Sequence, residues 1–204
     1  MHTIGTIVRL QIQRASLKTG DKPDRRYDPA PLLAVDRLQV TPDGVLGAAP
    51  AAALSPGGER ALIDAWIVDV HHRAHPATKN EDGLHGVSVG FTSHYEAMRA
   101  RFGARLETGC AGENIVVAAG RRFAFADLER GLLIQRQDGE EVVRLRVLQV
   151  AHPCRPFTGW ALGRLVEPEE LKASLQFLDE GMRGFYCAGV GAGTVSIGDE
   201  LVVL

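Results

Sequence analysis

Residues 141–156 read EVVRLRVLQVAHPCRP, and their pattern decides between the fold classes. Val143, Leu145 and Val147 alternate with charged or longer neighbours, which is typical of a strand with one buried face. Prolines bracket the cysteine that follows. Because proline donates no hydrogen bond to a sheet, we expect the strand to end before it. The segment therefore predicts a long strand that delivers Cys154 to a rigid loop.

Strand patterns also account for most of the other ordered segments. Residues 4–12 alternate with a period of two, which predicts a half-buried strand at the start of the chain. Residues 18–31 are polar and contain prolines, and we expect a surface loop there. The turn Gly198-Asp199 predicts a terminal hairpin. Further strands are expected at 36–40, 61–70, 141–150, 194–197 and 200–204.

Two segments have convincing helical patterns. Ser93 and Glu96 have the spacing of a capping box, and Gly103 is expected to end the helix that follows them. A second helix is expected over 168–178, because a proline fits its first position and two glutamates favour its positive end. Gly181 is its expected stop.

The fold class that follows is mainly β: one barrel-like domain over residues 1–204 with two or three α-helices. A formal net charge of −2 argues against general nucleic-acid binding, which needs many cations to neutralise phosphates. No stretch is long and apolar enough to span a bilayer, and the first residues do not resemble a secretory signal. Three cysteines without a CxxC pair suit a reducing compartment, so we expect a cytoplasmic protein.

Cys154 is the first candidate functional residue. It lies between His152 and Arg155, and an imidazole and a guanidinium both favour the thiolate, the form that binds metal or carries sulfane sulfur. If extended geometry continues beyond the strand, His152 and Cys154 share one face. A buried structural cysteine is the alternative, and the local sequence favours neither. Cys187 has no companion at metal-ligand spacing, so we expect it in the core.

Three further motifs are candidates for a binding site. Residues 109–114, GCAGEN, precede an apolar run, and their glycines would let backbone N–H groups approach an anion. Residues 56–61, PGGERA, carry Arg60, which would clamp a phosphate. For both, a plain turn is the more frequent interpretation. Residues 183–186, RGFY, would bring an arginine and aromatic rings to a pocket, or would pack as a helix-to-strand connection.

Five of the seven histidines lie between His71 and His94. A zinc site needs three or four convergent ligands, and this cluster matches no zinc motif. We therefore expect no zinc, and we interpret these residues as polar loop or interface histidines. A metal-dependent hydrolase built on the cluster is the remaining alternative.

In chain order, PGGERA, GCAGEN, the run His152-Pro153-Cys154, RGFY and the Gly198-Asp199 turn resemble the MOSC domain. This is the family of the C-terminal domain of molybdenum cofactor sulfurases, and the likeness extends from about residue 57 to residue 204. Pro56 stands where many members have a histidine before a glycine pair. Residues 66–92 are longer than the equivalent region of minimal members, so we interpret them as a loop over the site.

The resemblance implies a barrel fold and the molybdenum cofactor, molybdopterin, as the bound group. Cys154 would ligate molybdenum in a small oxidoreductase that reduces N-hydroxylated compounds, with His152 as a second catalytic residue and a redox protein as electron donor. Two alternatives stay open: a sulfur carrier that receives a Cys154 persulfide from a sulfur-donor protein, and a cofactor-binding module without turnover. The implied cofactor-binding residues are Arg60, Gly109, Gly112, Glu113, Asn114, Arg155 and Arg183.

Overall fold

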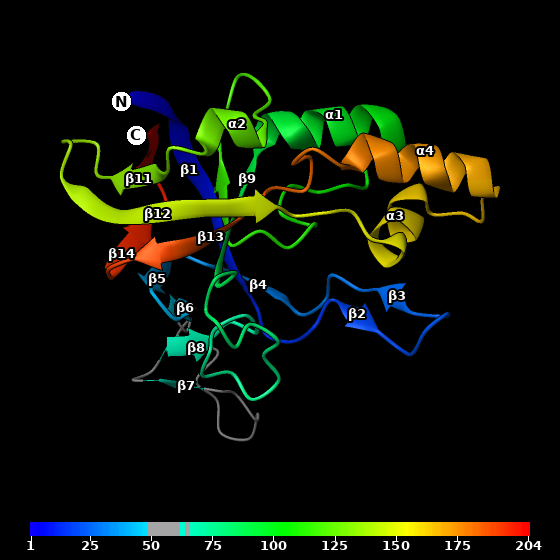
Figure 1. Ribbon diagram of the computed structural model, residues 1–204, viewed down its shortest axis with the longest axis horizontal. Coiled ribbons are helices and arrows are strands. Elements are labelled where there is room, and N and C mark those ends of the chain that lie inside the picture. Colours follow the sequence, from blue (N-terminus) through cyan, green and yellow to red (C-terminus); the bar gives the residue numbers. More distant parts are fainter. Residues whose placement is uncertain (49–61, 64–65) are drawn as a thin grey trace.

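In a computed structural model that describes residues 1–48, 62–63 and 66–204, the chain folds around a closed barrel (Figure 1). The barrel strands are β1 (His2–Gln13), β9 (Val87–Phe91), β10 (Ile115–Val117), β11 (Leu132–Gln135), β12 (Glu141–Val150), β13 (Phe185–Val190) and β15 (Glu200–Val203). Their order is β10-β9-β13-β12-β11-β15-β1, and β10 pairs with β1 to close the ring. The β9–β10 pair is parallel and the others are antiparallel. The predicted mainly β, barrel-like fold is confirmed.

The strand that decided the fold class has the predicted bounds. In β12, the predicted inward side chains of Val143, Leu145 and Val147 are all buried, because alternate residues of a strand face the same side. The register with β13 shifts between Val147 and Gln149. Such a bulge bends a strand and interrupts its alternation, so the regular two-face pattern stops as the chain approaches Cys154.

A smaller sheet lies against the barrel. Its strands, in order of pairing, are β14 (Gly193–Ser196), β5 (Arg37–Thr41), β6 (Gly44–Ala48), β8 (Trp66–Val68) and β7 (Leu62–Ile63). The strand predicted at 36–40 corresponds to β5. The one predicted at 61–70 falls on β7 and β8, with 61 and 64–65 outside the described residues.

Two short features complete the β structure. β4 (Leu32–Val35) pairs with β1 outside the closed barrel. β2 (Lys18–Thr19) and β3 (Arg26–Tyr27) form a separate ribbon. This ribbon lies inside the segment 18–31, for which only a surface loop was expected.

The predicted terminal hairpin is wrong. The two strands exist, but β14 pairs with β5, whereas β15 pairs with β1 and β11. The turn between them is tied to the barrel: Gly198 N–H donates to Ile7 O at 3.0 Å, and the Asp199 carboxylate accepts from Arg136 Nη1 at 2.7 Å. The chain therefore passes from one sheet to the other at this turn, which the period of the sequence does not reveal.

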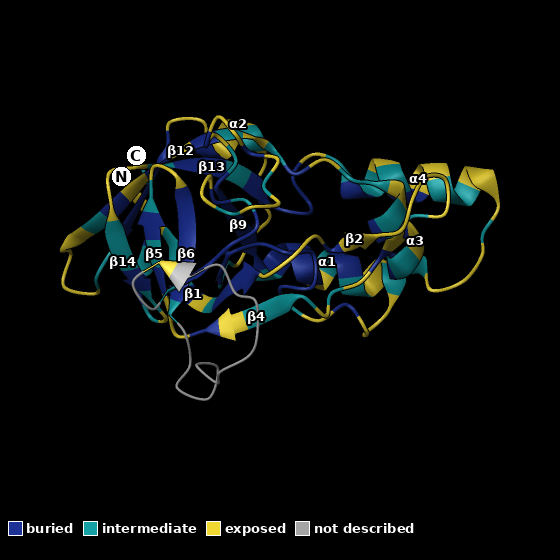
Figure 2. Ribbon diagram, turned by 90° about the horizontal axis from the view of Figure 1, so that it is seen from below, coloured by how far each residue is buried: buried dark blue, intermediate teal, exposed yellow. Residues whose placement is uncertain are grey.

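The described residues contain four helices: α1 (Thr92–Phe102), α2 (Phe125–Leu128), α3 (Arg155–Leu162) and α4 (Pro168–Leu178). Figure 1 and Figure 2 place α1, α3 and α4 at the end of the molecule away from the two termini. The second predicted helix has the bounds of α4. None of the described helices is long and apolar enough to cross a membrane.

Several helix details differ from the predictions. The capping box at Ser93 is wrong: α1 has no side-chain cap, and Ser93 Oγ donates instead to Arg121 O at 2.7 Å. Gly103 does end α1, with φ of 99°. The capping residue of α4 is Asp179, two residues before the glycine expected to stop it. α2 and α3 were not predicted.

The helices α1, α3 and α4 and the β2–β3 ribbon enclose a second core, which we call the helical core. Its fully buried members include Tyr95 and Met98 from α1, Phe157 from α3 and Leu178 from α4. Tyr27 from β3 meets the Phe157 ring edge-on, with 5.0 Å between ring centroids. This packing fixes α3, and with it the cysteine that precedes the helix.

Candidate functional site

Cys154 lies at the start of α3. β12 ends before it, as the prolines predicted, and residues 151–154 form the expected loop, but α3 begins directly after the cysteine, at Arg155. Pro156 stands in the first helical turn, where its missing N–H costs no hydrogen bond. Thr158 holds the Cys154 carbonyl through its N–H and its Oγ1, both at 3.0 Å. The backbone of the cysteine is therefore fixed by the helix that follows it.

Arg183 supplies the cation beside the sulfur. Its Nη1 lies 3.8 Å from Cys154 Sγ and donates to His152 O at 3.1 Å. Its Nη2 donates to Ala111 O at 3.3 Å, and the guanidinium lies 4.4 Å from the centre of the Phe157 ring. The side chain is buried, yet its Nε has no hydrogen-bond partner among the described residues. This arrangement complements a negatively charged sulfur and leaves one buried donor for a ligand.

The sequence neighbours of Cys154 have other surroundings. The His152 ring is exposed, and its Nδ1 lies 3.1 Å from Asp179 Oδ1. Arg155 is exposed and makes no hydrogen bond or ion pair with any described residue. Because β12 ends at Val150, the strand face that His152 and Cys154 were expected to share does not form. The cation beside the sulfur comes from a residue distant in sequence, not from an adjacent one.

A cavity of about 380 Å³ opens beside Arg183. This volume lies at the lower end of the range of small-molecule sites. None of its described lining residues is acidic. A lining of this kind attracts anions even in a chain with a formal net charge of −2. Its basic residues are Lys18, Arg25, His71, Lys79, His152 and Arg183.

Sequence reasoning missed three of these cations. Lys18 begins β2, Arg25 directly precedes β3, and Lys79 lies in the loop after β8. The clustering of basic residues in 18–31 was a signal, but it carries no information on which distant residues the ribbon faces. Arg60, the cation predicted from PGGERA, lies outside the described residues.

The GCAGEN turn is held in place by two glutamines of β1. Gln11 Nε2 donates to Gly109 O at 2.7 Å, and Gln13 Nε2 donates to Gly112 O at 2.7 Å. Both glycines have positive φ, 89° and 101°. A Cβ at either would lie 2.9 Å from the glutamine side chain that holds it. The glycines are therefore needed for a close approach to β1.

Four of the six backbone N–H groups of this turn, those of Cys110, Ala111, Gly112 and Asn114, donate within the protein. Cys110 donates to Glu107 O, Ala111 to Tyr95 Oη, and Asn114 to Ser88 Oγ, at 3.0 to 3.1 Å. These amides are not available to an anion. The turn does reach the cavity at Ala111, whose carbonyl also holds Arg183. Direct cofactor binding by Gly109, Gly112, Glu113 or Asn114 stays a prediction.

Glu113 is buried outside the cavity lining. Its Oε2 accepts from Tyr95 Oη at 2.5 Å, and its Oε1 has no hydrogen-bond partner among the described residues. Burial raises the pKa of Glu113, and the hydrogen bond from Tyr95 only partly opposes this rise. The carboxyl therefore keeps its proton to a higher pH than an exposed glutamate does.

Replacing Glu113 with Gln is expected to change how stability depends on pH. A raised folded-state pKa stabilises the protein below the unfolded value of about 4.5, and this contribution is lost as the pH rises toward the folded value. Glu113→Gln does not lose stability in this way. Its free energy of unfolding relative to the wild type therefore increases by about 1.4 kcal/mol per pH unit between the unfolded-state and the folded-state pKa. Urea unfolding at about pH 5 and about pH 8 measures this difference in free energy of unfolding between the variant and the wild type. The exposed Glu96→Gln is the control, and equal differences for both variants would contradict the assignment.

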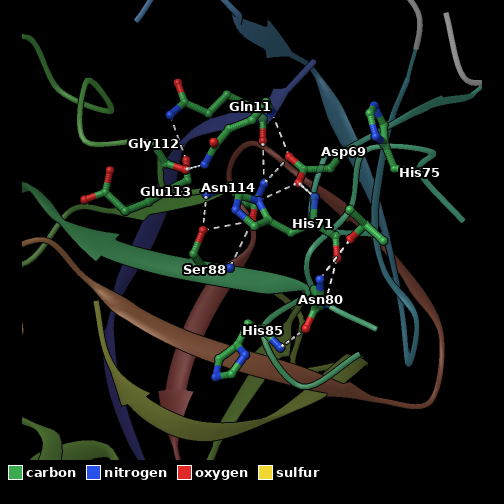
Figure 3. A network of polar contacts seen from close by, with 12 residues as sticks. Gln11, Asp69, His71, His75, Asn80, His85, Ser88, Gly112, Glu113 and Asn114 are labelled. Atoms are coloured by element: carbon green, nitrogen blue, oxygen red, sulfur yellow. Dashed lines mark hydrogen bonds and ion pairs between the residues drawn. The ribbon is translucent and has the colours of Figure 1, made fainter. Parts of the chain in front are cut away.

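Asn114 joins three elements in a buried network (Figure 3). Its Oδ1 accepts from the N–H and the Oγ of Ser88 in β9, at 3.0 and 2.9 Å. Its Nδ2 donates to Asp69 Oδ2 at 3.0 Å and to Gln11 O at 3.2 Å. Asn114 thus links β9, β1 and the segment after β8. Its amide faces these groups, and it does not line the cavity.

The histidines between His71 and His94 are spread over the described structure. Among the described residues, no group of three or more His, Cys, Asp or Glu side chains is placed to hold a metal ion. His94 accepts from Phe123 N–H at 2.9 Å, and burial lowers the pKa of His94 to about 4. His71 and His85 lie near Tyr186, at 6.5 and 5.4 Å between ring centroids. Of the five, His71 lines the cavity.

One solved bacterial protein has a fold similar to that of this chain. The structure is similar to the YuaD protein from Bacillus subtilis: 15% identity, TM-score 0.52, 98% of this chain and 93% of that chain. The YiiM structures from Geobacillus stearothermophilus and Escherichia coli match at 13% and 14% identity, each with a TM-score of 0.48, covering all of this chain and 74% and 71% of theirs. At these identities the likeness concerns the fold alone. No curated protein matches the sequence.

The sequence itself matches a family model. The model of the MOSC domain matches residues 85–202, which is more than half of the chain. This range begins later than the expected likeness from about residue 57, and it includes GCAGEN, Cys154 and Arg183. The chain belongs to the MOSC domain family.

Proposed function

We propose that the protein binds the molybdenum cofactor in the basic cavity, with Cys154 as the metal ligand, and reduces N-hydroxylated compounds there. The observation that carries this proposal is the position of Arg183. The buried guanidinium lies 3.8 Å from the Cys154 sulfur and also lines the cavity. One cation, Arg183, thus lies beside the thiol and also lines the cavity that attracts anions.

The residues present fit an anionic cofactor bound through sulfur. Thiolates are soft metal ligands, and Cys154 is half-buried beside a permanent cation. Lys18, Arg25 and Lys79 offer positive charge to a phosphate or oxo group. The unpartnered Nε of Arg183 adds a buried donor. Carboxylates, which would repel such a ligand, do not occur among the described lining residues.

The residues of the chain would hold and orient the bound cofactor. The molybdenum centre supplies the redox chemistry when it is bound. Thr158 fixes the backbone of Cys154, and Arg183 is held by two carbonyls and the Phe157 ring. A site whose donors are positioned in advance loses little freedom when its ligand arrives.

A Cys154 persulfide carrier is the second candidate. Partial exposure of the sulfur favours it, because a persulfide must be reached by a donor and by an acceptor. Protein from a cofactor-competent host distinguishes the two proposals. About one molybdenum per chain and turnover of hydroxylamine support the reductase. Molybdenum without turnover supports a binding module. No molybdenum and a mass increase of about 32 Da, one sulfur, support the carrier.

A further inference from the structure

We propose that His71 is a catalytic residue of this site, the proton donor to the departing oxygen of an N-hydroxylated substrate, and that Asp69 positions it. This inference rests on the proposed reductase function. His71 lay within a histidine cluster that the sequence assigned to a polar loop. The structure separates it from that cluster and places it in the cavity wall.

Asp69 is a fully buried carboxylate surrounded by N–H donors (Figure 3). Its Oδ2 accepts from Gln13 N–H at 2.7 Å and from Asn114 Nδ2 at 3.0 Å. Its Oδ1 accepts from the backbone N–H of His71 at 2.8 Å. Three N–H donors on two oxygens favour the charged form of a carboxyl group, which makes Asp69 the acceptor in its contacts.

The hydrogen bonds of Asp69 bear on the tautomer of His71, that is, on which ring nitrogen carries the hydrogen. Its Nδ1 lies 3.0 Å from Asp69 Oδ1, and two acceptors cannot share that contact without a hydrogen. Beside a charged Asp69 this hydrogen belongs on Nδ1, and Nε2 is the ring nitrogen left for proton transfer. Nε2 makes no hydrogen bond with a described residue. Asn80 Nδ2 holds the His71 carbonyl at 2.7 Å, so backbone and ring are both anchored.

Arg183 relates His71 to the sulfur, since it lines the same cavity as His71 and lies beside Cys154. His71 lies near the Tyr186 ring, and both line the cavity together with Arg183, which contacts Cys154 Sγ. The His71 side chain is 30% exposed, whereas the Asp69 side chain is not exposed at all. The ring therefore reaches solvent-accessible space from a buried anchor. A buried carboxylate behind an imidazole is the arrangement that orients a proton-transfer group in many active sites.

The proposed step balances in atoms and charge. Reduction breaks the N–O bond and consumes two protons and two electrons; a partner redox protein and the bound cofactor would supply the electrons. The Nε2–H of protonated His71 goes to the departing oxygen, which leaves as water. A second proton, from solvent in the cavity, goes to nitrogen and forms the N–H bond. His71 is left as the neutral Nδ1–H form that Asp69 holds.

Nitrogen NMR of the metal-free protein tests the positioning directly. With ¹⁵N-labelled histidine, we expect neutral His71 to carry its hydrogen on Nδ1, the reverse of the form that free histidine prefers. His75 is in the same loop and has no carboxylate partner among the described residues, so it provides an internal reference. An Nε2–H form of neutral His71 would overturn the proposal, and this measurement does not depend on molybdenum or on turnover.

His71→Gln tests the proton transfer. In molybdenum-loaded protein, kcat for hydroxylamine is expected to fall about 100-fold, since general acids contribute that much or more, while KM and molybdenum content change less than about two-fold. His75→Gln should leave kcat unchanged. An unchanged kcat in His71→Gln would contradict the role of His71 as proton donor but not the reductase proposal. A wild-type protein that holds no molybdenum defeats the reductase proposal and the donor role together.

Discussion

Cys154→Ser is expected to lower molybdenum retention about 100-fold or more while leaving the fold intact. A serine hydroxyl stays protonated near neutral pH, so it is a poor substitute for a thiolate ligand. Removing even an outer-shell partner of a metal ligand typically costs about 10- to 100-fold in affinity, and removal of the ligand itself should cost more. Arg183 would then face a neutral group in place of the sulfur that it lies beside.

Cys110→Ser is the matched control for this prediction. Cys110 lies in the GCAGEN turn with its thiol buried, and burial raises the pKa of Cys110 to about 12, so it stays a neutral thiol. A hydroxyl in its place costs about 1–3 kcal/mol of stability but removes no ligand. Elemental analysis after desalting measures retention, and thermal unfolding checks the fold. Equal molybdenum content in the two variants would show that Cys154 is not the metal ligand.

The fold class was predictable, because the barrel strands β1, β12 and β15 have local patterns, but β9, β11 and β13 were not predicted. The alternation of β12 gave its exact bounds, and the proline and glutamates gave those of α4. The terminal hairpin and α3 were not predictable in the same way. Whether β14 joins β15 or β5 depends on side chains distant in sequence. Pro156 does not distinguish a loop from the start of a helix, because proline is common both in loops and in the first turn of a helix.

The site was predictable in its centre and not in its surroundings. Cys154 and Arg183 were both predicted, and the structure brings them within 3.8 Å of each other. The predicted cation next in sequence, Arg155, is exposed at the first residue of α3. The amides expected to bind an anion in GCAGEN are used within the protein, since Tyr95 and other buried groups lie opposite them. Partners of this kind are set by tertiary contacts.

Asp69 shows the same limitation most clearly, and it carries the largest expected effect on stability. In the sequence it is one acidic residue beside a histidine cluster. In the structure it joins β1, the turn before β10 and the loop after β8 through Gln13, Asn114 and His71. Its neighbours depend on it, because each of their N–H groups is a donor directed at a buried carboxylate.

Asp69→Ala is therefore expected to lower the free energy of unfolding by about 3–5 kcal/mol, the usual cost of removing one partner from a buried charged network. The N–H groups of Gln13 and His71 and the amide of Asn114 would each lose an acceptor. Asp43→Ala is the matched control, because its half-exposed ion pair with Arg73 is worth about 0–1 kcal/mol. Urea unfolding at neutral pH compares the two. A loss below about 1 kcal/mol for Asp69→Ala would mean that water replaces the carboxylate, and that the network does not depend on Asp69 to hold the cavity wall at His71.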